Sequence, residues 1–204
     1  MIIIMRKSST KPATPRAAAK DATHDRIVDV AARAIRRSGY DGTGVADIMK
    51  EAGLTHGAFY AHFDSRAAML AEAAECAFSQ AASAMAALTA EVEPDKALES
   101  LLAGYLSKAH QDQVDTGCPL AALGSETARQ SPEVRRVATR HARALIDLVA
   151  RLSPDWGQPG SHERALVTVS TMVGALLLAR AVDDPALAGK LRHTALEHLT
   201  ERAH

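Results

Sequence analysis

The side chains most able to hydrogen-bond an external partner gather in residues 55–63, which read THGAFYAHF. Phe59 and Phe63 lie one helical turn apart, so they define a face that turns inward. The opposite side would carry hydroxyl, imidazole and small residues: Thr55, His56, Gly57, Ala58, Tyr60 and His62. Hydroxyl and imidazole groups hydrogen-bond phosphates and base edges, and a glycine lets the backbone come close. The stretch therefore predicts a surface that can hydrogen-bond an external partner.

A second short helix must support this stretch, because an isolated helix of fewer than about 12 residues is marginal in water. Just upstream, Val45, Ile48 and Met49 recur at helical spacing. Gly53 can adopt the left-handed conformation that ends one helix, and Thr55 offers a hydroxyl that caps the next. Two short helices joined by a sharp turn are typical of a helix-turn-helix, whose second helix enters the DNA major groove. An ordinary helical hairpin in an all-helical domain is the alternative.

The flanking residues extend this motif in a fixed order. A helix with an apolar face precedes it, and another helix follows it. Over about residues 25–70 the chain resembles the N-terminal domain of the TetR family of bacterial transcriptional regulators. The residues that carry the resemblance are Gly39-Tyr40, Thr43, Ile48 to Gly53, Tyr60 to Phe63, and Ser65-Arg66.

This resemblance implies roles for particular side chains. Thr43, Tyr60 and Arg66 are expected to contact phosphates, which set register on DNA rather than sequence preference. Thr55 is expected to cap the second helix and to touch phosphate as well. Gly44 stands where the family usually has a capping serine or threonine, which weakens one phosphate contact. Arg66 replaces the usual lysine and keeps its charge.

The formal net charge is zero, from 24 Lys and Arg against 24 Asp and Glu. Residues 1–66 nevertheless carry 11 basic and 7 acidic side chains, whereas residues 67–204 carry 13 and 17. The positive excess lies in the part of the chain expected to meet DNA, as electrostatic binding to phosphates requires.

Residues 1–23 predict a flexible basic arm, because they are rich in basic, hydroxyl and proline residues before the first helical pattern. The arm would follow the phosphate backbone or enter the minor groove. A disordered terminus that contributes little is the alternative. We divide the remaining chain into a helix-turn-helix domain, residues 24–66, and a helical body for effector binding and dimerisation, residues 67–204.

The sequence of residues 67–204 predicts an all-α fold, since Ala is abundant, aromatic residues are scarce and no strand-like alternation of apolar and polar residues occurs. We expect helices near residues 65–88, 95–110, 133–152, 162–182 and 185–203, with a short piece entered through Pro119. In the resembled family such helices surround an apolar cavity for a small effector. The residues expected to line it are Tyr105, His110, Cys118, Leu123 and Met172, with core packing as the alternative for each.

Two cysteines, Cys76 and Cys118, lie far apart without a CxxC motif, so neither a disulfide framework nor a zinc site is indicated. Cys118 precedes a proline at a helix start and could sense oxidants or electrophiles; a buried structural cysteine is the alternative. A cytoplasmic protein fits this composition. We expect no membrane span, because MIIIM is too short and the later apolar runs are interrupted.

The apolar segment 163–184 predicts a dimer interface by the same resemblance, in which the last two helices form a four-helix bundle with a second copy. One stripe carries Leu166, Val169, Val173, Leu176 and Leu177. A two-fold dimer also suits DNA readout, because it places two short helices in successive major grooves about 34 Å apart. A buried helix of a monomer is the alternative.

The leading interpretation is a homodimeric regulator of double-stranded operator DNA, a repressor that a small-molecule effector releases. A helical metal-dependent enzyme is the first alternative, and a DNA-binding protein without an effector is the second. The nine histidines give the enzyme little support, because the pair His193 and His198 and the pair His56 and His62 lack the i, i+4 spacing of a helical zinc site. We therefore expect neither a catalytic site nor a metal or cofactor.

Overall fold

The computed structural model describes residues 14–201, and in this range every regular element is a helix. This confirms the all-α prediction. In chain order the elements are α1 (Pro15–Ser38), α2 (Val45–Glu51), the 3₁₀ helix η1 (His56–Ala61), α3 (Arg66–Thr89), the 3₁₀ turn η2 (Pro94–Lys96), α4 (Ala97–Tyr105), α5 (Lys108–Asp112), α6 (Pro119–Thr127), α7 (Pro132–Leu152), α8 (Ser161–Ala181) and α9 (Pro185–Glu201).

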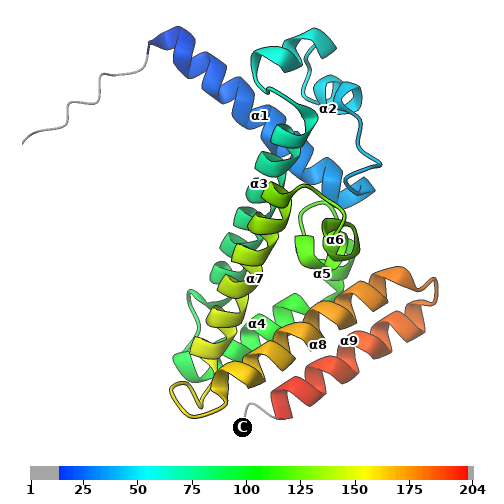
Figure 1. Ribbon diagram of the computed structural model, residues 1–204. Helices are drawn as coiled ribbons and strands as arrows, with labels where there is room; N and C mark the ends of the chain where they lie inside the picture. Colours follow the sequence, from blue (N-terminus) through cyan, green and yellow to red (C-terminus); the bar gives the residue numbers. More distant parts are fainter. Residues whose placement is uncertain (1–13, 202–204) are drawn as a thin grey trace, which may run out of the picture.

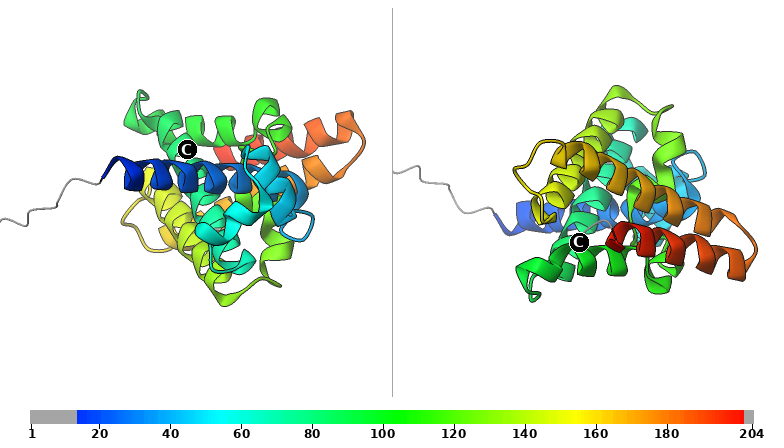
Figure 2. Two further views of the ribbon diagram at one scale, coloured as in Figure 1. Left: turned by 90° about the horizontal axis from the view of Figure 1, so that it is seen from above. Right: turned by 90° about the horizontal axis from the view of Figure 1, so that it is seen from below.

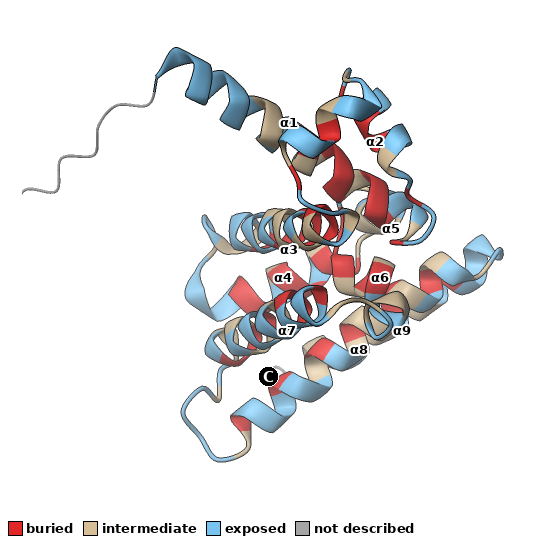
Figure 3. Ribbon diagram, turned by 45° about the horizontal axis from the view of Figure 1, so that its top comes forward, coloured by how far each residue is buried: buried red, intermediate tan, exposed pale blue. Residues whose placement is uncertain are grey.

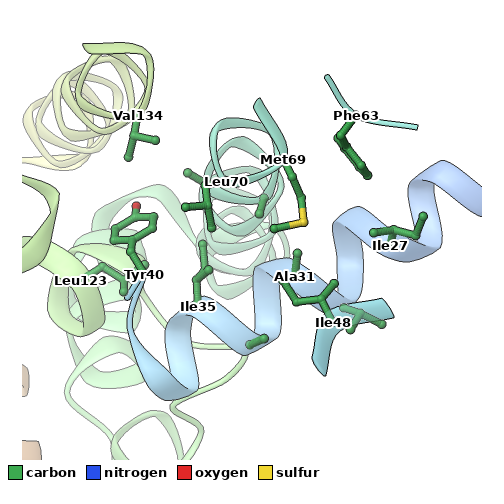
Figure 4. Packing of buried hydrophobic residues seen from close by; sticks show 14 of the residues in the cluster. Ile27, Ala31, Ile35, Tyr40, Ile48, Phe63, Met69, Leu70, Leu123 and Val134 are labelled. Carbon is green, nitrogen blue, oxygen red and sulfur yellow. The ribbon is translucent and has the colours of Figure 1, made fainter. Parts of the chain in front are cut away.

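The first part of the chain forms a small head around one apolar cluster. Ile27, Ala31 and Ile35 recur on one face of α1 and point toward α3, as Figure 4 shows. Phe59 and Phe63 join the same cluster from η1 and the residues after it. The short helices α2 and η1 are therefore held by packing against α1 and α3, as their length requires.

Helix α3 runs from the head into the body, where α4 to α9 enclose a second apolar cluster (Figure 1). Helices α8 and α9 lie side by side at the far end, and α1 crosses the opposite end (Figures 1 and 2). The head cluster also includes Leu123 of α6 and Val134 of α7. Head and body therefore share a packed boundary rather than a flexible linker.

Two predicted elements differ from the structure. The arm predicted for residues 1–23 is helical from Pro15 onward, because Thr14 caps α1 by accepting the Ala17 amide and Pro15 occupies the first helical position. Residues 1–13 lie outside the described range. The single helix predicted for residues 95–110 is interrupted, since the Ser107 hydroxyl accepts the His110 amide and starts α5 separately.

Helix α8 is long and apolar enough to cross a membrane by length and composition alone. The expectation that no later apolar run is long and uninterrupted enough to span a bilayer therefore fails on length and composition alone, which is weak evidence for a span. One face of α8 is nevertheless buried against α7 and α9, and a core helix meets the same criterion. Its other face is exposed (Figure 3).

Candidate nucleic-acid interface and the pocket behind it

The turn between α2 and η1 is a complete Schellman motif. The Leu54 amide donates to the Met49 carbonyl at 2.8 Å, and the Gly53 amide donates to the Lys50 carbonyl at 3.0 Å. Gly53 has a φ of +72°, the left-handed conformation that glycine adopts without strain. This geometry fixes the angle at which η1 leaves α2.

The recognition element is a six-residue 3₁₀ helix, not the α-helix expected from sequence. Side chains three residues apart lie above one another in a 3₁₀ helix. Gly57 and Tyr60 therefore share one edge, and both are exposed; Tyr60 has 72% of its surface in solvent. A Cβ atom built on Gly57 meets no atom within 4 Å, so nothing inside the protein requires glycine there.

His56 extends the exposed edge, with its ring 6.1 Å from that of Tyr60 in an edge-on arrangement. Thr55 is also exposed and stands at the N-cap position of η1, but its hydroxyl makes no capping hydrogen bond. The capping role expected for Thr55 is therefore wrong, and its hydroxyl stays available to an external partner.

Two residues expected on the DNA side turn partly inward. His62 lies three residues after Phe59 and therefore follows the buried side of the 3₁₀ helix. Burial and the nearby His24 lower the pKa of His62, whose Nδ1 atom is buried. Ala58 is half-buried against the head cluster. Both side chains are therefore only partly exposed.

Thr43 and Arg66 support the head from inside. Thr43 is 4% exposed, and its hydroxyl donates to the Gly39 carbonyl at 2.7 Å. The Arg66 Nη2 group donates to the Tyr40 and Thr43 carbonyls and so ties the start of α3 to the loop before α2. In this structure the Thr43 hydroxyl is therefore hydrogen-bonded within the protein, and the Arg66 guanidinium is largely committed to backbone carbonyls.

A pocket of about 260 Å³ lies behind the head, between α3, α4, α5 and the loop before α6. Of the residues expected around an effector cavity, Tyr105, His110 and Cys118 line it. Leu123 belongs instead to the head cluster and Met172 to the body cluster, where core packing, the alternative, accounts for both. Cys118 is 3% exposed, as in a structural cysteine.

The hydrogen bonds of His110 fix its tautomer. Its Nδ1 donates to the Tyr105 carbonyl at 2.7 Å, since a carbonyl only accepts, and its Nε2 accepts the Cys118 amide at 3.0 Å. Burial lowers the pKa of His110, the Tyr105 carbonyl raises it, and Arg180 lowers it further. The neutral ring therefore joins α4 to the start of α6.

A buried arginine connects this pocket to the head. Arg36 of α1 is 2% exposed, and burial lowers the pKa of its guanidinium. It donates to the Gln80 side chain at 2.6 Å and to the Gly117 carbonyl at 3.5 Å, and Gly117 lines the pocket. Sequence reasoning missed this residue, because an arginine near a helix end ordinarily faces solvent.

Helix α6 touches the head at its other end. The Glu126 carboxylate accepts the Tyr40 amide at 2.8 Å and covers Gly39, where a Cβ atom would lie 2.5 Å from it. Gly39 has a φ of +77° as well. Helix α6 therefore links two sites: Cys118, just before its first turn, lines the pocket, and Glu126 near its end binds Tyr40 just after α1.

The predicted dimer stripe is divided between two faces of α8. Val169 and Leu176 are buried in the body cluster, and Val173 packs against it. Leu166 is 42% exposed and Leu177 is half-buried. Val169 and Leu176 are therefore not available to a second copy. The exposed apolar side chains of this end are Leu166, Val167 and Leu178 on α8 and Leu187 on α9.

Among residues 14–201, no group of three or more His, Cys, Asp or Glu side chains is arranged to hold a metal ion.

Comparisons with known proteins match both parts of the chain. The family model described as bacterial regulatory proteins, tetR family, matches residues 27–73. The model described as transcriptional regulator LmrA/YxaF-like, C-terminal domain, matches residues 94–188. An uncharacterized HTH-type transcriptional regulator of Mycobacterium tuberculosis is 31% identical, and the match covers 88% of this chain and 97% of the relative.

Solved structures share the fold at lower identity. A TetR-family regulator from Agrobacterium tumefaciens is 24% identical with a TM-score of 0.73, covering 88% of this chain and 98% of that one. The reduced form of NemR from E. coli is 20% identical with a TM-score of 0.72, covering 88% and 96%. With its helix-turn-helix, its helical body and these matches, the chain belongs to the TetR family of DNA-binding transcriptional regulators.

Proposed function

We propose that this protein is a homodimeric repressor that binds operator DNA through η1 and is released when a small molecule occupies the pocket between α3, α4 and α5. One observation carries the proposal: the pocket wall at Gly117 is hydrogen-bonded to Arg36, which is buried under the head. A ligand that displaces Gly117 changes the environment of α1 directly. The proposed division is a head of residues 24–66 and a body of residues 67–204.

The exposed edge of η1 is the proposed reading surface. Thr55, His56, Gly57 and Tyr60 supply hydroxyl, imidazole and backbone groups at a position that nothing else in the described chain covers. His62 and Arg66 act mainly by fixing the position of this edge. Exposed apolar side chains on α8 and α9 would be covered in a dimer, because contiguous exposed apolar surface marks an interaction site.

A larger cavity of about 480 Å³ lies at the far end of the body, beside the loop 153–160. Among the described residues, no hydrogen bond joins its lining to the head. We therefore assign the effector to the smaller pocket, whose lining contacts both α6 and Arg36.

The test is a fluorescence-anisotropy titration with the duplex immediately upstream of the coding region and a scrambled duplex as control. We expect selective binding by a dimer that weakens as salt rises, because phosphate contacts release counterions. The Tyr60→Ala variant should bind the duplex at least about tenfold more weakly, which is about 1.4 kcal/mol. Trp156→Ala is the matched control, since Trp156 is a 56% exposed aromatic on a distant loop.

Equal binding of both duplexes, or equal losses in Tyr60→Ala and Trp156→Ala, would count against η1 as the reading surface. Operator affinity that no small molecule changes would count against the effector and favour a regulator that acts by occupancy alone.

A further inference from the structure

The pocket between α3, α4 and α5 follows one face of α3. The α3 residues that line it are spaced by three or four positions, as on one side of a helix: Ala81, Ala84, Met85 and Leu88. From the first to the last of them a helix rises about 10 Å. The pocket volume of about 260 Å³ is slightly below the usual range for ligand pockets, about 300–1,000 Å³. The pocket therefore suits a small, elongated molecule.

The end of the pocket near Ala81 is its polar end. Arg36 donates to the carbonyls of Ala77 and Gly117, both at 3.5 Å. Because Ala77 precedes Ala81 by one helical turn, these two hydrogen bonds place Gly117 beside the part of α3 that is nearer the head. Thr116 also lines the pocket, is exposed and carries a hydroxyl. A ligand meets a hydroxyl and main-chain groups at this end.

The lining offers no charge to a ligand. Among the described residues that line the pocket, none is Asp, Glu, Lys or Arg. Both ring nitrogens of His110 are hydrogen-bonded within the protein, and burial lowers the pKa of the ring. Burial raises the pKa of Tyr105, so its hydroxyl stays protonated at neutral pH. A charged group taken into the pocket would find no counter-charge in the lining, and an uncompensated buried charge is far more costly than a neutral polar group.

The other end of the pocket is apolar and is closed by Leu88. Gly104 of α4 lines the pocket beside it, and a Cβ atom built on Gly104 would lie 2.6 Å and 2.7 Å from the two methyl carbons of Leu88. The Leu88 side chain therefore folds over Gly104, into space that any larger residue would need. The Ser100 hydroxyl donates to the Leu88 carbonyl at 2.8 Å, which holds α4 against α3 at this point.

Gly104 controls how far Leu88 reaches into the pocket. The backbone accepts Gly104→Ala, because position 104 lies in α4 and its φ is not in the left-handed region. The added methyl group would displace the flexible end of the Leu88 side chain, and the free space beside that end is the pocket itself. The glycine therefore keeps the apolar end of the pocket open.

We infer that the pocket binds an uncharged, elongated molecule with its polar end beside Gly117 and its apolar tail ending on Leu88, and that Gly104 sets the length of this tail. The inference names the chemical class of the effector and rests on the proposed function only for that regulatory role. The ligand's polar end then lies next to the loop whose carbonyl Arg36 holds. Charge and tail length are selected separately, the first by the lining as a whole and the second by the pair Leu88 and Gly104.

The test uses the straight-chain primary alcohols from butanol to nonanol as probes of the full chain, labelled with ¹³C at its methionine methyl groups. Met85 lines the pocket, so its methyl resonance reports occupancy, whereas Met172 is buried in the body cluster and is the internal control. We expect the affinity to rise about fourfold for each added methylene, or about 0.8 kcal/mol, until the tail reaches Leu88, and to rise no further beyond that length. The carboxylate and the amine of equal chain length, both charged at pH 7.5, should bind at least about tenfold more weakly.

Two substitutions should move the length limit in opposite directions. Gly104→Ala should lower the longest tail that still adds affinity, and Leu88→Ala should raise it. In the Leu88→Ala background, Gly104→Ala should leave the limit unchanged, because the side chain that it displaces is gone. Either single variant alone tests the limit if the other does not fold. Gly124→Ala is the matched control, since Gly124 is an exposed glycine of α6 with open space around it and does not line the pocket.

The inference is overturned if no alcohol shifts the Met85 resonance up to its solubility limit, if a charged analogue binds as tightly as the alcohol, or if all variants share one length limit. Operator release is measured separately by anisotropy. An alcohol that binds without changing operator affinity would refute the effector role and leave the ligand class standing. Release by the charged analogues alone would refute the ligand class and leave the effector role standing.

Discussion

Gly53 and Gly57, four residues apart, are predicted to respond in opposite ways to the same added methyl group. At both positions a Cβ atom would meet nothing within 4 Å, so steric crowding is excluded for each. They differ in backbone conformation, since φ is +72° at Gly53 and is not in the left-handed region at Gly57. The pair therefore separates a glycine that the fold requires from one that only an external partner requires.

The expected magnitudes follow from this difference. Gly53→Ala places a side chain in the left-handed conformation and should lower the free energy of unfolding by about 1–2 kcal/mol. Gly57→Ala restricts the unfolded chain without native strain and should raise it by about 0.4–1 kcal/mol. If the η1 backbone approaches DNA at Gly57, the same variant should weaken operator binding at least about tenfold, or about 1.4 kcal/mol.

Urea unfolding followed by circular dichroism measures the stabilities, and anisotropy with the operator duplex measures affinity. Gly124→Ala is the matched control, because Gly124 is an exposed glycine on α6 with equally open space and no proposed contact with DNA. Destabilisation by Gly57→Ala would mean that the fold itself requires this glycine. Unchanged affinity in a stable Gly57→Ala variant would refute the close approach of the η1 backbone to DNA.

Two further predictions concern the connection between pocket and head. Arg36→Met should lower the free energy of unfolding by about 1–3 kcal/mol, because the Gln80 side chain and buried carbonyls lose their donor. It should also shrink the effector-induced change in operator affinity, which DNA titrations with and without a small molecule that releases the operator would measure. Because burial lowers the folded pKa of His110, the neutral ring stabilises the fold above its unfolded pKa of about 6.5, and this contribution is lost as pH falls through the folded pKa. Urea unfolding between pH 4.5 and 8 should therefore show a smaller loss of unfolding free energy in acid for His110→Gln than for the unchanged protein, and identical pH profiles would contradict a lowered pKa of His110 in the folded state.

The helices were predictable from sequence because their signals are local. The recurrence of Ile27, Ala31 and Ile35 follows from the helical period, and Pro119, Pro132 and Pro185 each stand at the first position of a helix. The start of α5 also has a local signal, the N-cap residue Ser107, which hydrophobic periodicity does not detect. The spacing of the hydrophobic residues gives no sign of the break between the end of α4 at Tyr105 and the start of α5 at Lys108.

The 3₁₀ geometry of η1 could not be predicted in the same way. Over six residues, α and 3₁₀ helices both place Phe59 inward, but they differ in the rotation per residue, about 3.6 against 3.0 residues per turn. That difference decides whether His62 turns toward solvent or toward Phe63 and His24. The sequence therefore indicated which short helix carries the exposed edge, but it assigned two partly buried side chains, Ala58 and His62, to that edge.

Buried polar contacts depend on residues far apart in the chain. Arg66 binds the backbone carbonyls of Tyr40 and Thr43, and Arg36 is buried because α3 and the loop before α6 supply its acceptors. A single sequence gives no sign of such pairs. The same reason explains why Leu123 and Met172 were expected at a cavity and lie in apolar clusters instead.

The acceptors that Arg36 meets at Ala32, Ala77 and Gly117 are main-chain oxygens, which every amino acid carries. A substitution at Ala32 or Ala77 therefore keeps the backbone carbonyl that accepts from Arg36. The side chains of α3 that line the pocket, such as Met85 and Leu88, can therefore change without removing the backbone carbonyls that Arg36 binds at Ala77 and Gly117. Descendants of this protein could thus diversify in what they detect without having to rebuild how they respond.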